Sequence, residues 1–102
     1  MKIIKKLSDY IENEIDDAKK YARCSLEYKE SEPNLSKLFY TLATEEMDHM
    51  SRLHKAVTEI IEEYLEKNGE PPAQMQAVYD YLHEKHIDNA TEVKTMLAMY
   101  KE

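Results

Sequence analysis

Two long stretches of this chain contain no helix-breaking residue, and this feature limits the possible folds more than any other. Residues 3–30 and 34–68 contain neither glycine nor proline. The only glycine and all three prolines lie in two short segments, 31–34 and 68–72. An all-β domain needs many tight turns, which often use these residues. We therefore expect an all-α fold.

The pattern within each long stretch predicts a helix with one inward stripe, because the stripe positions alternate steps of three and four residues. The first stripe comprises Ile4, Leu7, Ile11, Glu14, Ala18, Tyr21, Ser25 and Tyr28. The second comprises Leu35, Phe39, Leu42, Glu46, His49, Leu53, Ala56, Ile60 and Tyr64. Each helix would be about 40–50 Å long. The short break between them predicts a long antiparallel hairpin over residues 3–68.

The remaining segment, 71–102, predicts two short amphipathic helices at about 72–86 and 89–101. Gly69 is expected to cap the second long helix. Asn89 with Glu92 has the spacing of a capping box that would start the last helix. These helices would cap the hairpin or contact a neighbouring subunit. No linker or repeat divides the chain, so we expect a single domain over residues 1–102.

Three polar residues occupy stripe positions where apolar residues are expected: Glu14, Glu46 and His49. Glu46 and His49 form a Glu-x-x-His motif, which places both side chains on one side of a helix. Glu14 lies about 19 residues before Pro33, and the motif begins about 13 residues after it, so a hairpin brings all three near one level. No Lys or Arg on the stripes is placed to balance the carboxylates. Oxygen and nitrogen ligands without thiolate suit iron, manganese or zinc, so the pattern predicts a metal site.

A purely structural interpretation of these residues also stands. They could form the solvated edge of an open hairpin, or a polar contact that fixes its register. A Glu-x-x-His match alone arises easily by chance in a chain this rich in acidic residues. The metal interpretation depends on all three residues lying at one level.

The chain supplies only half of a four-helix di-metal site, which needs a Glu from each of two helices and a Glu-x-x-His from each of the other two. Two hairpins related by a two-fold axis would supply this set. Their four carboxylates would balance two divalent cations. We therefore expect a homodimer or a higher homo-oligomer that completes a four-helix bundle.

With these residues identified, residues 3–65 resemble one half of the ferritin-like superfamily, particularly rubrerythrins and the short encapsulated ferritins. The resemblance implies that Glu14, Glu46 and His49 are both ligands and catalytic residues of a di-iron centre, with Glu46 as the bridging carboxylate. It also implies ferroxidase activity, in which dioxygen oxidises Fe(II) to Fe(III), and iron storage or handling. An encapsulating shell protein is an implied partner, although residues 99–102 do not resemble a shell-targeting tail.

The resemblance also admits peroxide reduction of the rubrerythrin kind. Neither a second helix pair with its own ligands nor a rubredoxin-like module is recognisable here. Two further function classes stay open. One is a metal-free helical module that dimerises through the same stripes, and the other is a dimer with structural zinc or iron.

Other polar residues are weaker candidates. Asp80 or His86 could bind a metal together with His83, although His86 also fits the apolar face of its helix. We interpret His54 as a surface or interface residue. Tyr21 could hydrogen-bond near the metal site, but packing is the simpler role.

The net charge of −7 argues against binding to nucleic acid or to an anionic membrane, because both need clustered positive charge. Cys24 is the only cysteine and has no partner for an internal disulfide. No apolar run reaches the roughly 18 residues of a membrane span. The expected location is the cytoplasm.

Overall fold

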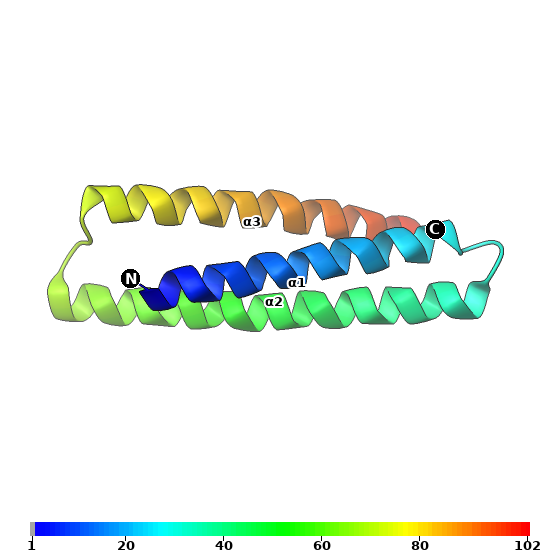
Figure 1. Cartoon of the computed structure of the whole chain (residues 1–102), viewed down its shortest axis with the longest axis horizontal. Helices are drawn as coiled ribbons and strands as arrows, with labels where there is room; N and C mark the ends of the chain where they lie inside the picture. The colour runs from blue at the N-terminus through cyan, green and yellow to red at the C-terminus, as the bar shows by residue number, and fades with distance from the viewer. Residues whose placement is uncertain (1) are drawn as a thin grey trace.

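The computed structural model describes residues 2–102, and among these residues it contains three α-helices and no strand. Helix α1 spans Lys2–Glu27, α2 spans Pro33–Asn68 and α3 spans Ala73–Tyr100. They run up, down and up along a rod of 55 × 19 × 18 Å (Figure 1). The all-α fold and the long hairpin are confirmed. Met1, the first residue of the expected domain, lies outside the described residues.

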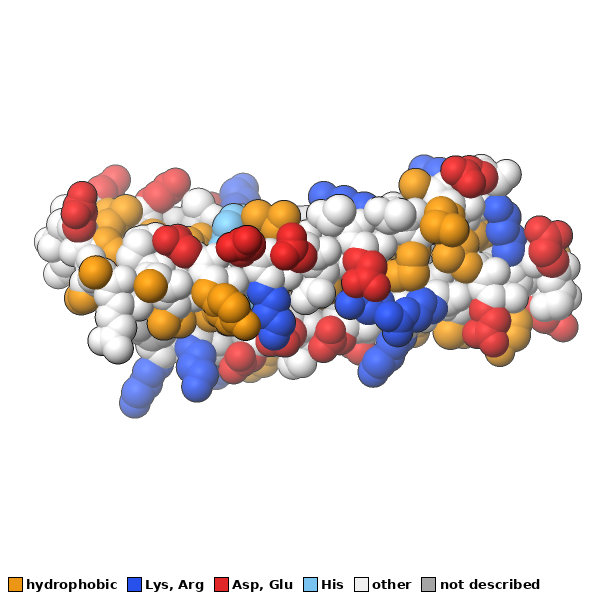
Figure 2. All heavy atoms as spheres, turned by 90° about the horizontal axis from the view of Figure 1, so that it is seen from above, with side chains coloured by type: hydrophobic (Ala, Val, Ile, Leu, Met, Phe, Trp, Pro, Cys, Tyr) orange, Lys and Arg blue, Asp and Glu red, His pale blue; other side chains and the backbone are white. Residues whose placement is uncertain are grey.

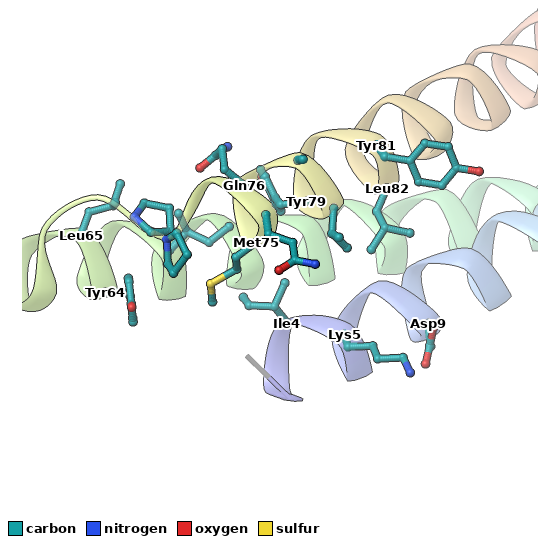
Figure 3. A pocket seen from close by; sticks show the side chains of 16 residues that line it. Ile4, Lys5, Asp9, Tyr64, Leu65, Met75, Gln76, Tyr79, Tyr81 and Leu82 are labelled. Atoms are coloured by element: carbon teal, nitrogen blue, oxygen red, sulfur yellow. The ribbon is translucent and has the colours of Figure 1, made fainter.

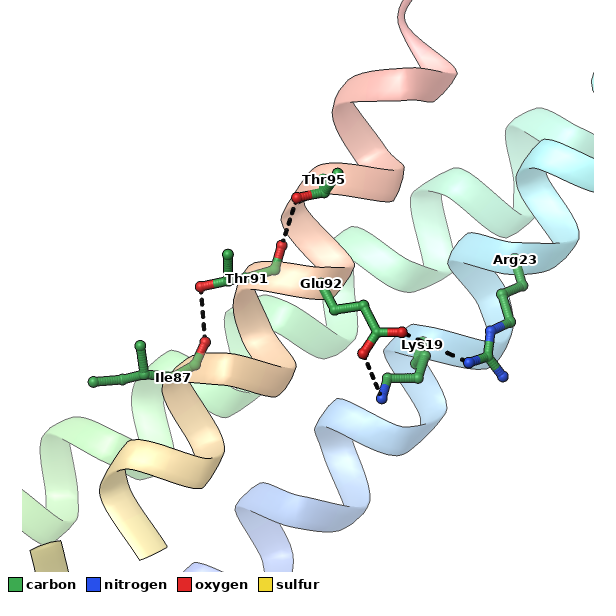
Figure 4. Close-up of polar contacts among 6 residues, drawn as sticks. All are labelled: Lys19, Arg23, Ile87, Thr91, Glu92 and Thr95. Atoms are coloured by element: carbon green, nitrogen blue, oxygen red, sulfur yellow. Dashed lines mark hydrogen bonds and ion pairs between the residues drawn. The ribbon is translucent and has the colours of Figure 1, made fainter. Parts of the chain in front are cut away.

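The prediction of two short helices in the C-terminal segment is wrong, because this segment forms one helix. Helix α3 is continuous for 28 residues and passes through Asn89 without a break. The hydroxyl groups of Thr91 and Thr95 donate to the carbonyls four residues earlier, at 2.8 Å and 3.0 Å, as in an unbroken helix (Figure 4). Local preferences for a helix end are weak, and packing of the buried Ala90 and Val93 outweighs them.

Glu92 has a different role from the predicted capping box. Its carboxylate reaches across to α1, where it lies 3.0 Å from Nζ of Lys19 and 3.8 Å from an Nη atom of Arg23 (Figure 4). Lys85 makes a second link of this kind, with its Nζ 2.9 Å from Glu12. Helix α3 therefore packs mainly against α1.

Small residues bring α1 and α2 close together. Ala18, Ala22 and Ala43 are completely buried between helices. Near the first turn, the buried hydroxyl of Ser36 donates a hydrogen bond to the backbone carbonyl of Ser25. Proline begins α2, where it removes no helical hydrogen bond.

The buried line of each helix lies partly one residue beyond the predicted stripe. In α1, four stripe residues are buried as expected, but Ser8, Ile15 and Ala22 are buried instead of Leu7, Glu14 and Tyr21. The buried residues of α1 are Ile4, Ser8, Ile11, Ile15, Ala18, Ala22 and Ser25. Those of α2 are Ser36, Ala43 and Val57, each one position after a stripe residue. Among the stripe residues that are not buried, Leu7, Tyr21, Leu53 and Ile60 pack against this core.

The turn between α2 and α3 depends on Gly69, as expected of a C-cap. Its φ is +75° and its ψ is −163°, a combination almost confined to glycine. Its N–H donates to the carbonyl of Leu65 at 3.0 Å.

Replacing Gly69 with alanine should lower the free energy of unfolding by about 1–2 kcal/mol. An added Cβ would meet no atom within 4 Å, so backbone strain alone would cause the loss. Urea unfolding measures the change, and Glu70→Ala is the matched control at the next position. Equal stability of the two variants would show that the turn relaxes to accept a side chain.

The end of the bundle near the start of α1 holds an apolar cavity. It has a volume of about 1020 Å³ and is lined by residues of all three helices, including Ile4, Lys5 and Asp9 of α1 (Figure 3). Ile4, Leu65, Met75 and Leu82 are among its lining residues. None of the three predicted metal ligands lines it, so the cavity and the candidate site are separate.

The surface carries mixed charge. On the face seen in Figure 2, acidic side chains extend along the rod, with Lys and Arg side chains interspersed. This face therefore offers no extended basic patch for a polyanion. Within residues 2–102, no helix combines the length and the apolar character needed to cross a membrane.

Candidate metal centre

The three predicted ligands meet at one level of the α1–α2 hairpin. Glu14 comes from the middle of α1, while Glu46 and His49 lie on consecutive turns of α2. One ligand atom from each residue lies within 4.8 Å of those from the other two. In the described part of the chain, these residues are the one such group of three potential metal donors. The hairpin register estimated from the sequence is therefore confirmed.

The imidazole of His49 lies between the two carboxylates. Its Nδ1 is 3.5 Å from Oε2 of Glu14 and 3.9 Å from Oε1 of Glu46. Both separations are too long for strong hydrogen bonds. The side chains of Glu14 and Glu46 are 27% and 21% exposed, whereas that of His49 is 52% exposed. The carboxylates are thus mostly shielded, and the imidazole stands on the open side.

The electrostatics of the site are unfavourable without a cation. Oε2 of Glu14 is buried and has no hydrogen-bond partner among residues 2–102. The pKa of Glu46 is raised from 4.5 to about 7, because its carboxyl can hydrogen-bond to the Glu14 carboxylate only when protonated, because burial disfavours its charge, and because Glu14 is negative. His49 lowers this pKa less than these effects raise it, and Asp17 adds a further small increase. Glu46 therefore holds a proton up to about neutral pH, and a bound cation could replace that proton.

The donor set fits a divalent metal of the iron, manganese or zinc type. It combines carboxylate oxygen with imidazole nitrogen and has no thiolate. No Lys or Arg within residues 2–102 forms an ion pair with Glu14 or Glu46. One chain offers three ligands, which leaves coordination positions open toward the exposed side.

Helix α3 covers the side of the hairpin that faces away from this cluster. It contacts α1 at Glu12 and α2 at His54. Each helical residue turns the chain by about 100°, so Glu14 lies about 200° around α1 from Glu12. By the same geometry His49 lies about 140° around α2 from His54. The cluster therefore occupies a face that α3 leaves uncovered.

Aromatic side chains lie on this face about two helical turns from the cluster, with Tyr21 after Glu14 on α1 and Phe39 before Glu46 on α2. Tyr21 stacks on Phe39 with ring centroids 6.1 Å apart, and Tyr28 stacks on Phe39 at 6.2 Å. Within residues 2–102 the Tyr21 hydroxyl makes no hydrogen bond, and its ring packs against the hydrophobic core. Cys24 is free and half-buried.

The weaker C-terminal candidates do not join the cluster. Asp80 accepts a hydrogen bond from Gln76 at 2.8 Å, and neither Asp80 nor His83 belongs to the group of three close donors. His86 is 5% exposed, which confirms its alternative interpretation as a core histidine. The sequence interpretation missed a cross-helix contact between His54 and His83, whose ring nitrogens lie 3.0 Å apart. His54 lies 15 residues before Gly69 and His83 lies 14 residues after it, so their distances from that turn predict the contact.

Comparison with known proteins adds one finding. The family model described as Rubrerythrin matches residues 5–102, nearly the whole chain. No curated protein and no solved structure gives a significant match.

Proposed function

Because this chain belongs to the rubrerythrin family, we propose that two copies of it bind two iron ions at a shared centre and oxidise Fe(II) with dioxygen. Each copy would contribute Glu14, Glu46 and His49. The four carboxylates would carry a charge of −4, equal and opposite to that of two divalent ions. A rubrerythrin-family match supports di-iron redox chemistry in general, and ferroxidase turnover is the specific reaction proposed.

One observation carries the proposal: two shielded carboxylates without a cationic partner at the only close three-donor group of residues 2–102. Unpaired carboxylates in such a place destabilise a fold. The presence of these two carboxylates in the middle of a well-packed hairpin is explained if a metal ion occupies the site.

The uncovered face supports dimerisation around that site. Ile3 and Leu35 are 45% and 37% exposed, and each lies eleven residues, close to three helical turns, before a predicted carboxylate ligand. Tyr10, 46% exposed, lies one turn before Glu14. A second hairpin packed on this face would bury these apolar groups and supply the missing half of the ligands.

Each protein group has a defined task in this proposal. Glu14 and Glu46 balance the cation charge, and Glu46 releases its retained proton when metal binds. His49 supplies a neutral nitrogen donor. The half-buried Phe39 and Leu42, which precede Glu46 by about two turns and one turn of α2, would limit access of water from that end of the site. Iron, when bound, would supply the electrons that pass to dioxygen.

The test is anaerobic addition of Fe(II) to the purified chain, followed by admission of oxygen. We expect a dimer that binds about two iron ions and then develops ferric absorbance. Bound metal without oxidation would contradict turnover and favour a structural metal dimer. Absence of bound metal would reject the site itself. A parallel anaerobic sample receives hydrogen peroxide, and faster oxidation there would favour the rubrerythrin-like reaction over ferroxidase activity.

A further inference from the structure

We propose that His54 and His83 form a second metal site, separate from the carboxylate cluster, that binds one divalent transition-metal ion such as Zn²⁺ and fastens α3 to α2. Nε2 of His54 and Nδ1 of His83 approach to 3.0 Å across two helices. The rings lie partly stacked, with centroids 4.8 Å apart and an interplanar angle of 30°. This site does not depend on the proposed di-iron function.

The spacing of the two nitrogens suits a shared ion. Zinc binds imidazole nitrogen at about 2.0–2.1 Å in tetrahedral geometry, so two nitrogen ligands on one ion lie about 3.3 Å apart. The observed 3.0 Å differs by only a few tenths of an ångström. Small side-chain rotations would admit the ion without moving either helix.

Both rings can present a lone pair to the ion without losing a proton. Each neutral imidazole carries its hydrogen on one of two nitrogens, and here the far nitrogen of each ring would carry it. Burial and the neighbouring His83 lower the pKa of His54, which favours the neutral, metal-binding form. Without metal, one of the two facing nitrogens must instead donate its hydrogen to the other.

The surroundings hold the pair in place and leave it accessible. The ring of Tyr79 stacks on His83 with centroids 5.7 Å apart. His54 and His83 are half-buried, so an ion can reach them from solvent. His86 lies one turn further along α3, and its buried Nε2 has no hydrogen-bond partner in the described part of the chain. The proposed protein ligands are His54 and His83 alone, and water would fill the remaining coordination positions.

The experiment is calorimetric titration of Zn²⁺ into the full chain carrying Glu46→Ala and His49→Ala, which removes the carboxylate cluster. We expect one Zn²⁺ per chain and a raised melting temperature in its presence. Adding His83→Phe, which keeps the aromatic stack on Tyr79, should lower the affinity by at least about tenfold. Asp80→Asn, one turn earlier on α3, is the matched control and should leave the affinity unchanged.

His54→Phe, on the other helix, must give the same loss as His83→Phe. A loss in only one of the two variants, or no Zn²⁺ binding in the parent, would overturn the site. Imidazole ¹⁵N shifts in that parent give a readout independent of how the phenylalanine variants fold. Zn²⁺ should shift Nε2 of His54 and Nδ1 of His83, and unchanged shifts at both would contradict the proposal.

Discussion

Replacing either Glu14 or Glu46 with alanine is expected to lower the affinity for Fe(II) by more than about 100-fold while leaving the helices intact. In a symmetric dimer each substitution removes two of the four carboxylates, so two divalent ions would face a charge of only −2. Losing a group behind a ligand typically lowers metal affinity 10–100-fold, and losing the ligand should exceed that. Anaerobic dialysis against Fe(II) measures the affinity, and circular dichroism measures the helices.

Asp48→Ala is the matched control for these variants. Asp48 lies between Glu46 and His49 in the chain, but it is exposed and pairs with Arg52 at 3.0 Å. Its removal takes one acidic charge from the same level without touching the cluster. If Asp48→Ala lowers the affinity as strongly as Glu46→Ala, general negative charge rather than ligation holds the metal. If the Glu14 and Glu46 variants bind Fe(II) normally, the assigned ligand set is wrong.

The parts of the structure that depend on local chemistry were predictable. Pro33 and Gly69 mark helix ends because one lacks a backbone donor and the other adopts a positive φ. The distance of each candidate ligand from the first turn was then enough to predict that Glu14, Glu46 and His49 meet. Their role in binding metal is a prediction that the geometry permits and the proposed experiments test.

The parts that depend on long-range packing were not predictable. Asn89 resembles a helix start, yet α3 continues because its flanking residues pack on α1. Helical periodicity marks a broad apolar face, but it does not show which part of that face a third helix covers.

The proposed dimer explains why the buried residues of α1 and α2 lie partly one position beyond the predicted stripes. The predicted stripes combined two sets of residues on adjacent sides of the hairpin. One set, with Ile11 and Ala18, is buried within the single chain. The other set, with Glu14 and Tyr21, is half-buried beside it. A hairpin covered by α3 on one side and by a second copy on the other would need both sets, which accounts for stripes broader than the core of one chain.

The second large effect concerns pH in the metal-free protein. Relative to the natural chain, Glu46→Gln should gain up to about 3 kcal/mol in the free energy of unfolding as the pH rises from 4.5 to 7. Between these values folded Glu46 keeps a proton that the unfolded chain has released, so rising pH destabilises the natural fold. Below pH 4.5 both states hold the proton, and the difference disappears. Glutamine has no such proton to lose.

The comparison with Glu46→Gln is needed because two histidines change the stability with pH in the opposite direction to Glu46. Burial lowers the pKa of His54 and of His86 below 6.5, so these histidines destabilise the fold as the pH falls through that range. Subtracting the two unfolding curves, measured in urea with a chelator present, removes their contribution. Glu45→Gln, at the exposed neighbouring position, should show no comparable gain.

Metal should reverse the effect of pH at Glu46, because a bound cation replaces the proton and favours the ionised carboxylate. With saturating Zn²⁺ or Mn²⁺, the natural chain should therefore become more stable than Glu46→Gln above pH 7. The crossing of the two stability curves would identify Glu46 as both the proton-holding and the metal-binding group. If instead Glu46→Gln shows no gain between pH 4.5 and 7 without metal, Glu46 is already ionised and stabilised in the fold, and the unbalanced charge that supports the metal centre is absent.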